Sequence, residues 1–186
     1  LLTASPPWSD PDSPHVPSLA NRHQYDMLIF TYPHETAVAR ALAEGELPWW
    51  DPARLSGHPL LADGQTGSLH PPRLLLQWLF PPRLAYPLHL VLHLAAAGLG
   101  MYAYLRSLGC GRAAALTGAV VWMLGGQNAV TYKYGSVLPL SALLPLALMA
   151  GDGLAGSRPA ASAAGLALAL AGMLMASHPQ FLYYAA

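Results

Sequence analysis

Charged residues are scarce in this chain of 186 residues. Asp, Glu, Lys and Arg make up 10% of it, whereas 54% of the residues are hydrophobic. Soluble domains carry about 25% charged residues, so the deficit favours a membrane protein over a soluble or a disordered one. The formal net charge is zero, which gives no reason to expect nucleic acid as a partner.

Cysteines and familiar catalytic motifs are also missing. The one cysteine, Cys110, excludes an internal disulfide framework and a multi-cysteine metal site. The sequence contains no Gly-rich phosphate loop, no G-x-S-x-G motif and no H-E-x-x-H motif. The search for a function therefore turns to the few polar residues and their distribution.

These polar residues are concentrated in the first part of the chain. Eight of the nine carboxylates and five of the eight histidines precede Leu84, and the rest of the chain is mostly apolar. We expect residues 1–83 to form an extracytoplasmic loop with short interfacial helices, and residues 84–186 to form transmembrane helices of the same domain. Because the chain starts without methionine and ends in an apolar stretch, we expect a fragment truncated at both ends.

A short amphipathic helix is expected from Pro33 to Glu44. Apolar residues recur there at helical spacing opposite Glu35, Arg40 and Glu44, and Gly45 supplies a stop. Such a helix could lie along a membrane surface, and it could equally pack on its own loop in water.

The segments around this helix are expected to be loops. Residues 3–25 are rich in Pro, Ser and Asp, and prolines between residues 45 and 72 forbid long regular elements. Trp49 and Trp50 suit the headgroup level of a membrane. The apolar segment 74–80 is too short to span the ~30 Å hydrocarbon core and is expected to be interfacial or re-entrant.

Four candidates for transmembrane helices follow, and a further segment begins after residue 177. A spanning helix needs ~20 apolar residues. The third candidate is short, and Pro139 and Pro145 predict that it is kinked or tilted. The four candidates are residues 84–105, 113–130, 136–150 and 159–177.

The short loops predict the orientation of these helices. Loop 106–112 carries two arginines and no acid, and loop 151–158 lies on the same side of the membrane. The positive-inside rule therefore places both loops in the cytoplasm. The acidic first segment and the turn at residues 178–180 then fall together on the outer face.

Asp26 stands out among the carboxylates. It lies in the run Tyr25-Asp26-Met27-Leu28-Ile29-Phe30, among apolar and aromatic residues, whereas Asp51 and Asp63 occupy ordinary turn dipeptides. An apolar setting raises the pKa of a carboxylate unless a cation or a hydrogen-bond donor compensates. Asp26 is therefore a candidate functional residue.

His89 and His93 are one helical turn apart within an apolar segment, so they share a face. Ionisable residues inside a membrane are functional candidates. Hydrogen bonding between helices, or a position near the outer water boundary, would equally explain the pair. A metal site would need further ligands, which the sequence does not identify.

Taken in order, several short motifs resemble the YfhO-like family of bacterial membrane proteins. The resemblance covers residues 26 to 180. The chain departs from the family pattern at Tyr25, Asp51, His70 and Ser177, where members usually have Gly, Asn, Tyr and Gly. The motifs are Tyr25-Asp26, Tyr32-Pro33, Glu44-Gly45-Glu46-Leu47-Pro48-Trp49-Trp50-Asp51-Pro52, Gly57-His58-Pro59-Leu60-Leu61-Ala62-Asp63-Gly64-Gln65, His70-Pro71-Pro72, Leu92-His93-Leu94, Arg106-Ser107-Leu108-Gly109 and His178-Pro179-Gln180.

The resemblance implies an all-α polytopic membrane protein: a transmembrane helix bundle like that of GT-C glycosyltransferases, with a large, partly helical first extracytoplasmic loop. It places the protein in the bacterial cytoplasmic (inner) membrane among membrane lipids. The implied reaction is sugar transfer from a polyprenyl-phosphate donor to a cell-envelope glycopolymer or glycolipid at the outer face.

The resemblance also makes Asp26 the catalytic acidic residue, acting as a base or through a divalent cation, Mg²⁺ or Mn²⁺; no cofactor is certain. Any of four arginines of the first segment, Arg22, Arg40, Arg54 or Arg73, could neutralise the donor phosphate. His178 and Gln180 are candidate donors to sugar or phosphate, although His178-Pro179 could simply be a helix-ending turn. The alternative function is that of a non-catalytic lipid-binding, transport or scaffold membrane protein.

Overall fold

The structure is a computed structural model that describes residues 30–54, 56–63, 67–131 and 135–176, together with Gln180 and Tyr183. All the regular elements in these ranges are helices, which confirms the all-α expectation. They are α1 (Tyr32–Ala43), α2 (Pro71–Leu79), α3 (Pro82–Ser107), α4 (Arg112–Leu124), α5 (Gly126–Thr131), α6 (Leu138–Gly153) and α7 (Pro159–Ala176).

Prolines mark where most of these helices begin. Proline occupies the first turn of α1, α2, α3 and α6, and it is the first residue of α7. The proline ring presets a helical φ, and in the first turn the missing N–H is not needed for an intrahelical bond. The starts of α1, α3, α4, α6 and α7 accordingly lie within two residues of those expected from sequence.

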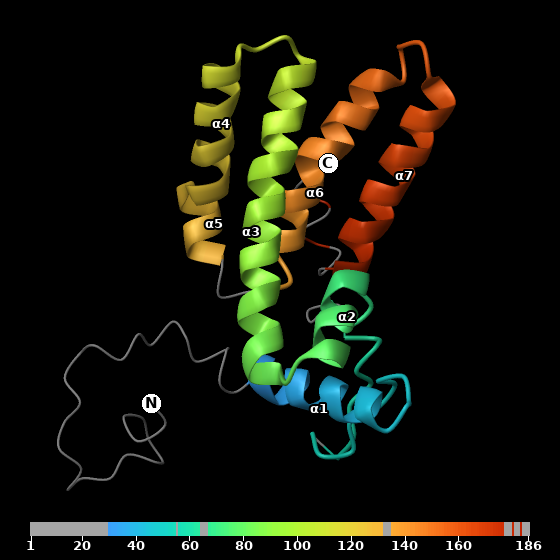
Figure 1. Cartoon of the computed structure of the whole chain (residues 1–186). Helices are drawn as coiled ribbons and strands as arrows, with labels where there is room; N and C mark the ends of the chain where they lie inside the picture. Colours follow the sequence, from blue (N-terminus) through green and yellow to red (C-terminus); the bar gives the residue numbers. More distant parts are fainter. Residues whose placement is uncertain are drawn as a thin grey trace, which may run out of the picture.

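The helices form a bundle with a smaller layer across one end (Figure 1). α3 packs against both α4 and α6, and α6 packs against α7. α1 and α2 lie at the Pro82 end of α3, whereas the α3–α4 and α6–α7 loops lie together at the opposite end. We call α1 and α2 the end layer.

Small residues let the bundle helices approach closely. A Cβ on Gly98 would come within 3.0 Å of the Met123 sulfur on α4, and one on Gly100 within 3.2 Å of the Ala142 carbonyl oxygen on α6. Close backbone approach at small residues is typical of helix packing in membranes. The buried core between α6 and α7 comprises Leu140, Ala147, Ala169 and Met173.

The expected continuous helix over residues 113–130 is wrong. Gly125 has an extended backbone, with φ −60° and ψ 159°, so α4 ends after 13 residues and the short α5 follows. Helices α4 and α6, of 13 and 16 residues, fall short of the ~20 residues that span a bilayer. Of the four expected spans, therefore, two reach the required length.

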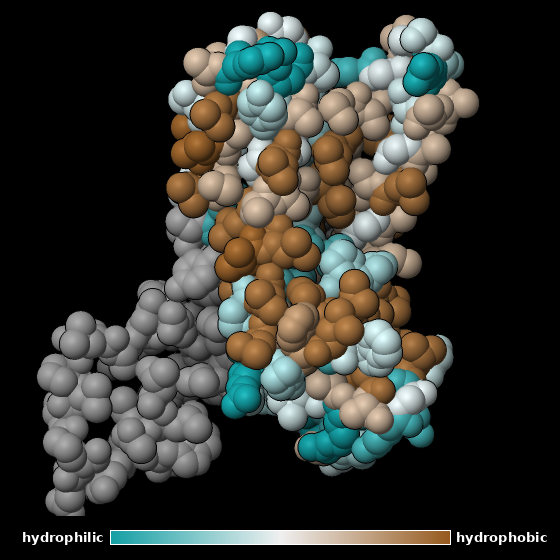
Figure 2. All heavy atoms as spheres, in the orientation of Figure 1, coloured by the Kyte–Doolittle hydropathy of each residue, from teal (hydrophilic) through white to brown (hydrophobic). Residues whose placement is uncertain are grey.

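Those two helices, α3 and α7, are long and apolar enough to cross a membrane. In the most apolar stretch of 18 residues, only 22% of α3 and 17% of α7 is buried inside the structure. The core helix of a soluble protein would be mostly buried. Figure 2 shows hydrophobic side chains gathered along the middle of the bundle and polar ones at its two ends. Such a large exposed apolar surface marks contact with lipid or with another protein.

Candidate functional site

The predicted site residues are only partly within the structure. Arg22, Asp26 and His178 lie outside the described residues. Arg40 lies on the exposed side of α1, and Gln180 is also exposed. The described part of the chain therefore does not bring the predicted site together.

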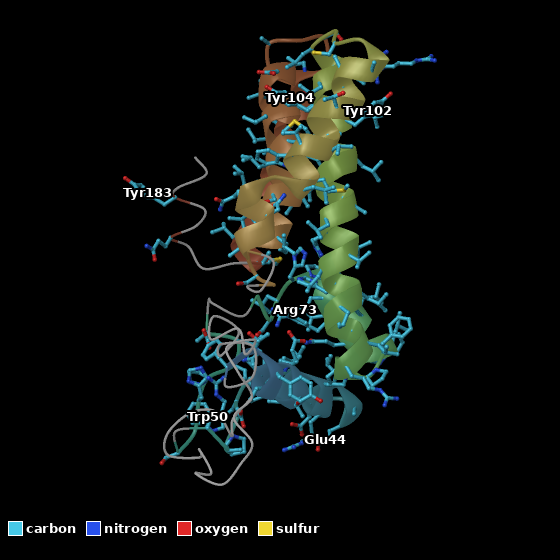
Figure 3. All side chains as sticks on the ribbon, turned by 90° about the vertical axis from the view of Figure 1, so that its left-hand side faces the viewer. Glu44, Trp50, Arg73, Tyr102, Tyr104 and Tyr183 are labelled. Carbon is cyan, nitrogen blue, oxygen red and sulfur yellow. The ribbon has the colours of Figure 1, made fainter. Side chains whose placement is uncertain are left out.

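A different group of polar side chains is buried where the end layer meets α3. Their fractional exposures are all 5% or less, which is unusual for charged and polar residues. Figure 3 shows Arg73 in this position, between α1 and the bundle, while Glu44 and Trp50 lie farther out. We call the group the polar layer: His34, Glu35, Ser68, His70, Arg73, Gln77, His89 and His93.

Glu35 is at the centre of one half of the polar layer. Its Oε1 accepts a hydrogen bond from Arg73, with which it forms a buried ion pair, and its Oε2 accepts one from Gln77. The expected position of Glu35, on the polar face of α1, is therefore wrong. Only Arg40 and Glu44 of that face are exposed.

The ion pair also decides what Arg73 can do. Burial lowers the pKa of Arg73 to about 10, with Tyr86 opposing the shift, so the guanidinium stays charged at neutral pH. Its charge is balanced by Glu35 inside the protein. The guanidinium of Arg73 therefore joins α2 to α1 through Glu35 and is not available to bind a phosphate.

Three histidines form the other half of the polar layer, next to the first turns of α3. The Nε2 atoms of His70 and His93 are 2.9 Å apart, and the ring centres of His89 and His93 are 4.3 Å apart. His89 Nε2 lies 2.8 Å from the carbonyl oxygen of Gly135, ahead of α6. The sequence allowed hydrogen bonding between helices for His89 and His93; in the structure both bond instead to residues just before other helices, Gly135 ahead of α6 and His70 ahead of α2.

Two backbone carbonyls determine the tautomers of these histidines. A carbonyl oxygen can only accept, so His89 donates from Nε2 to Gly135, and His93 donates from Nδ1 to the carbonyl oxygen of His89 at 2.7 Å. Neutral His93 then has an acceptor at Nε2, and His70 must donate to it from Nε2. The Nδ1 atoms of His70 and His89 remain as buried acceptors with no hydrogen-bond partner among the described residues.

The two histidines of the polar layer that lie outside α3, His34 and His70, are held neutral. Burial, and then the charge of Arg73, lowers the pKa of His34 to about 3, and its Nε2 lies 2.7 Å from the Ser68 hydroxyl. Burial, and then the neighbouring His93, lowers the pKa of His70 to about 4. Both side chains therefore act as neutral hydrogen-bonding groups at physiological pH.

A compact turn lies outside the polar layer. Asp51 and His58 form an isolated antiparallel bridge with two backbone hydrogen bonds of 2.8 Å. The Asp51 carboxylate accepts from the amide of Ala53 at 3.0 Å, and Asp63 pairs with His58 at 3.0 Å. Asp51 therefore lies in a turn, as expected from its dipeptide, and the carboxylates of Asp51 and Asp63 both stabilise that turn.

Gly67 joins this region to the far end of the chain. Its φ of +61° suits glycine, and a Cβ there would collide with the carbonyl oxygen of Ala176, the last residue of α7. The segment that leads into α2 therefore touches the helix that precedes His178-Pro179-Gln180. Segments more than 100 residues apart in sequence meet at the end layer.

The described residues supply no ligand set for a metal ion. No group of three His, Cys, Asp or Glu side chains among them is placed to hold one. The expected Mg²⁺ or Mn²⁺ depends on Asp26, which lies outside those residues.

Sequence reasoning missed most of the polar layer. The signal that could have found it is the spacing of Arg73 and Gln77, four residues apart in the otherwise apolar α2, which places them on one face. No family model, curated protein or solved structure matches the chain.

Proposed function

We propose that this chain belongs to a YfhO-like, polytopic membrane glycosyltransferase of GT-C type in the bacterial cytoplasmic membrane. It would transfer a sugar from a polyprenyl-phosphate donor to a cell-envelope glycopolymer or glycolipid at the outer face. The end layer would form part of the first extracytoplasmic loop.

The observation that carries this proposal is the contact between Gly67 and Ala176. The motifs of the resemblance occupy the segment from Glu44 to Pro72 and the residues directly after α7. A catalytic site built from both would require them at the same end of the bundle. The contact of Gly67 with the end of α7 meets that requirement.

The distribution of aromatic and charged residues supports the membrane part of the proposal. Trp49, Trp50 and Trp78 are exposed at or near the end layer, and Tyr102 and Tyr104 lie toward the opposite end (Figure 3). Aromatic residues are enriched at both interfaces of a membrane. The arginines of loop 106–112 lie at the end away from the end layer, which would then face outward.

In the proposed reaction, Asp26 deprotonates or orients the acceptor hydroxyl that attacks the anomeric carbon of the donor. The bond from that carbon to the phosphate oxygen breaks, and polyprenyl phosphate leaves. Arg22 and Arg40 bind the donor phosphate, and His178 and Gln180 donate hydrogen bonds to sugar or phosphate. The exposure of Arg40 leaves its guanidinium accessible for this role, whereas Arg73 is occupied by Glu35. A divalent cation at Asp26 would assist by binding phosphate oxygens.

The test is Asp26→Asn in the full-length protein, expressed in cells that lack the native copy. Loss of a catalytic base lowers the rate by ~10²–10⁴-fold, so we expect the envelope sugar measured by mass spectrometry to fall toward the level of the deletion strain. Protein abundance in the membrane is measured in parallel. Asp12→Asn neutralises another carboxylate of the first segment, in the proline-rich run Asp10-Pro11-Asp12 outside the motifs of the resemblance; it is the matched control and should keep the wild-type level.

Wild-type glycosylation with Asp26→Asn at normal abundance would contradict the catalytic role. It would favour the alternative of a non-catalytic lipid-binding, transport or scaffold protein. If Asp26→Asn lowers abundance, Asp26→Glu tests the role instead, because it retains the carboxylate while moving it by one methylene. If Asp26 is catalytic, the amount of envelope sugar divided by the abundance of the protein should fall in Asp26→Glu.

A further inference from the structure

A groove runs between α6 and α7 at the end of the bundle opposite the end layer. Its volume is about 560 Å³, within the range of ~300–1,000 Å³ that is typical of small-molecule sites. It is lined from α6 by Leu143, Leu146, Met149 and Ala150, and from α7 by Ala161, Gly165, Leu168 and Ala169.

Two polar residues contribute to the lining of this groove. They are Arg158, just before the first residue of α7, and Ser162 in the first turn. Arg158 is exposed and makes no ion pair with another residue in the described ranges. The groove therefore combines an aliphatic wall with one unbalanced positive charge at the end where the polar loops lie.

The other charges at this end of the bundle are also mostly positive. The loops and helix ends there carry Arg106, Arg112 and Arg158 against the single acid Asp152 among the described residues. Basic pockets between helices on the cytoplasmic side bind the headgroups of anionic lipids. An aliphatic groove with a cation at its polar end complements a molecule that has an apolar tail and an anionic head.

We propose that the groove between α6 and α7 binds one anionic phospholipid, with an acyl chain against Leu146, Gly165 and Leu168 and its phosphate at Arg158. This site lies at the opposite end of α7 from the end layer, so it is separate from the proposed transferase site; it rests on the membrane insertion and orientation of the proposed function, but not on its catalytic residues.

The test uses the full-length protein in nanodiscs of phosphatidylglycerol and phosphatidylcholine in equal amounts. Native mass spectrometry counts the lipids that stay bound after detergent release. We expect the wild-type protein to retain more phosphatidylglycerol than phosphatidylcholine. Arg158→Gln should lower the ratio of phosphatidylglycerol to phosphatidylcholine about fivefold, since each Arg near an anionic lipid contributes ~1 kcal/mol. Arg112→Gln removes an arginine at the same end but outside the groove, and it should leave the ratio unchanged.

A second pair of variants tests the apolar part of the groove. A Cβ on Gly165 would meet only the Ala150 Cβ, at 3.6 Å, so Gly165→Ala fits, whereas the longer side chain of Gly165→Leu enters the groove. Gly165→Leu should abolish retention of the bound lipid, and Gly165→Ala should keep it. If Gly165→Leu fails to fold, Ala161→Leu fills the same groove from an exposed position.

Two results would overturn the proposal. One is an unchanged lipid ratio in Arg158→Gln, because it would show that Arg158 does not contact the lipid headgroup. The other is unchanged lipid retention in the folded groove-filling variant, as expected if another segment of a longer chain occupied the groove.

Discussion

Glu35 and Arg73 form an ion pair that is almost completely removed from solvent. Burying two charges costs several kcal/mol per ion, and mutual attraction recovers this only when the geometry is good and further hydrogen bonds are made. Gln77 supplies such a bond to the second carboxylate oxygen. Through these bonds the three side chains join α1 to α2.

Glu35→Gln should be strongly destabilising, because it leaves the Arg73 charge buried without a partner. We expect the free energy of unfolding to fall by ~3–5 kcal/mol, measured by denaturant titration of the protein in detergent micelles. Arg40→Gln is the control on the exposed side of α1 and should stay within ~0.5 kcal/mol of wild type. The double variant Glu35→Leu/Arg73→Met should recover most of the loss. An effect of Glu35→Gln no larger than that of Arg40→Gln would contradict the buried pair.

The sequence alone does not predict the contacts of Glu35 and His70. Helical spacing correctly placed Arg40 and Glu44 on the exposed side of α1, but it assigned Glu35 there too because a carboxylate is normally exposed. The partner that buries Glu35 lies 38 residues away in sequence. His70 was likewise seen only as a departure from the family pattern, and the fold places it beside His93.

Helices were the most predictable elements, since proline and glycine mark their ends. Gly45 stops α1 as expected, with a φ of +76°. The expected helix over residues 113–130 runs past the break at Gly125, although the Gly125-Gly126 pair, followed by the polar Gln127 and Asn128, carries a signal for it. The contact between Gly67 and Ala176 could not be predicted, because it depends on how the segment before α2 meets the end of α7, 109 residues later.

Gly67→Ala tests this contact between elements. The change adds strain from the positive φ and a collision with the carbonyl oxygen of Ala176. A positive φ costs roughly 1–2 kcal/mol and overpacking ~1–3 kcal/mol, so we expect a total loss of about 2–5 kcal/mol in the same denaturant titration. Gly45→Ala is matched in φ but has nothing within 4 Å of the added Cβ. Gly45→Ala should lose only the stability that the positive φ costs. An equal loss of unfolding free energy in the two variants would refute the contact between Gly67 and Ala176.

At the scale of the whole molecule, composition predicted the helical class and the exposed apolar surfaces of α3 and α7. It could not distinguish four spans from two, because helix length depends on where single glycines and prolines interrupt an apolar run. The sidedness proposed for the molecule depends on three arginines and therefore needs a direct measurement.

Cys110 offers that measurement, since it lies between α3 and α4 at the end away from the end layer. In spheroplasts, a membrane-impermeant maleimide should label Cys110 only after the membrane is permeabilised. Glu44→Cys in a Cys110→Ser background places a thiol on the exposed end layer and should be labelled without permeabilisation. The reverse pattern would invert the orientation, and labelling of both thiols in sealed spheroplasts would exclude spanning between them.

The length of α3 has a consequence for how the protein meets a bilayer. Its 26 residues extend over roughly 39 Å, about 9 Å more than a hydrocarbon core of ~30 Å. If this surplus lies at the Pro82 end, beside the end layer, the hydrocarbon begins roughly at Leu88, immediately before the His89–His93 pair. Hydrophobic mismatch would then set the depth of the pair: a thinner bilayer leaves both buried imidazoles at the level of the headgroups, whereas a thicker one places them at the level of the acyl chains.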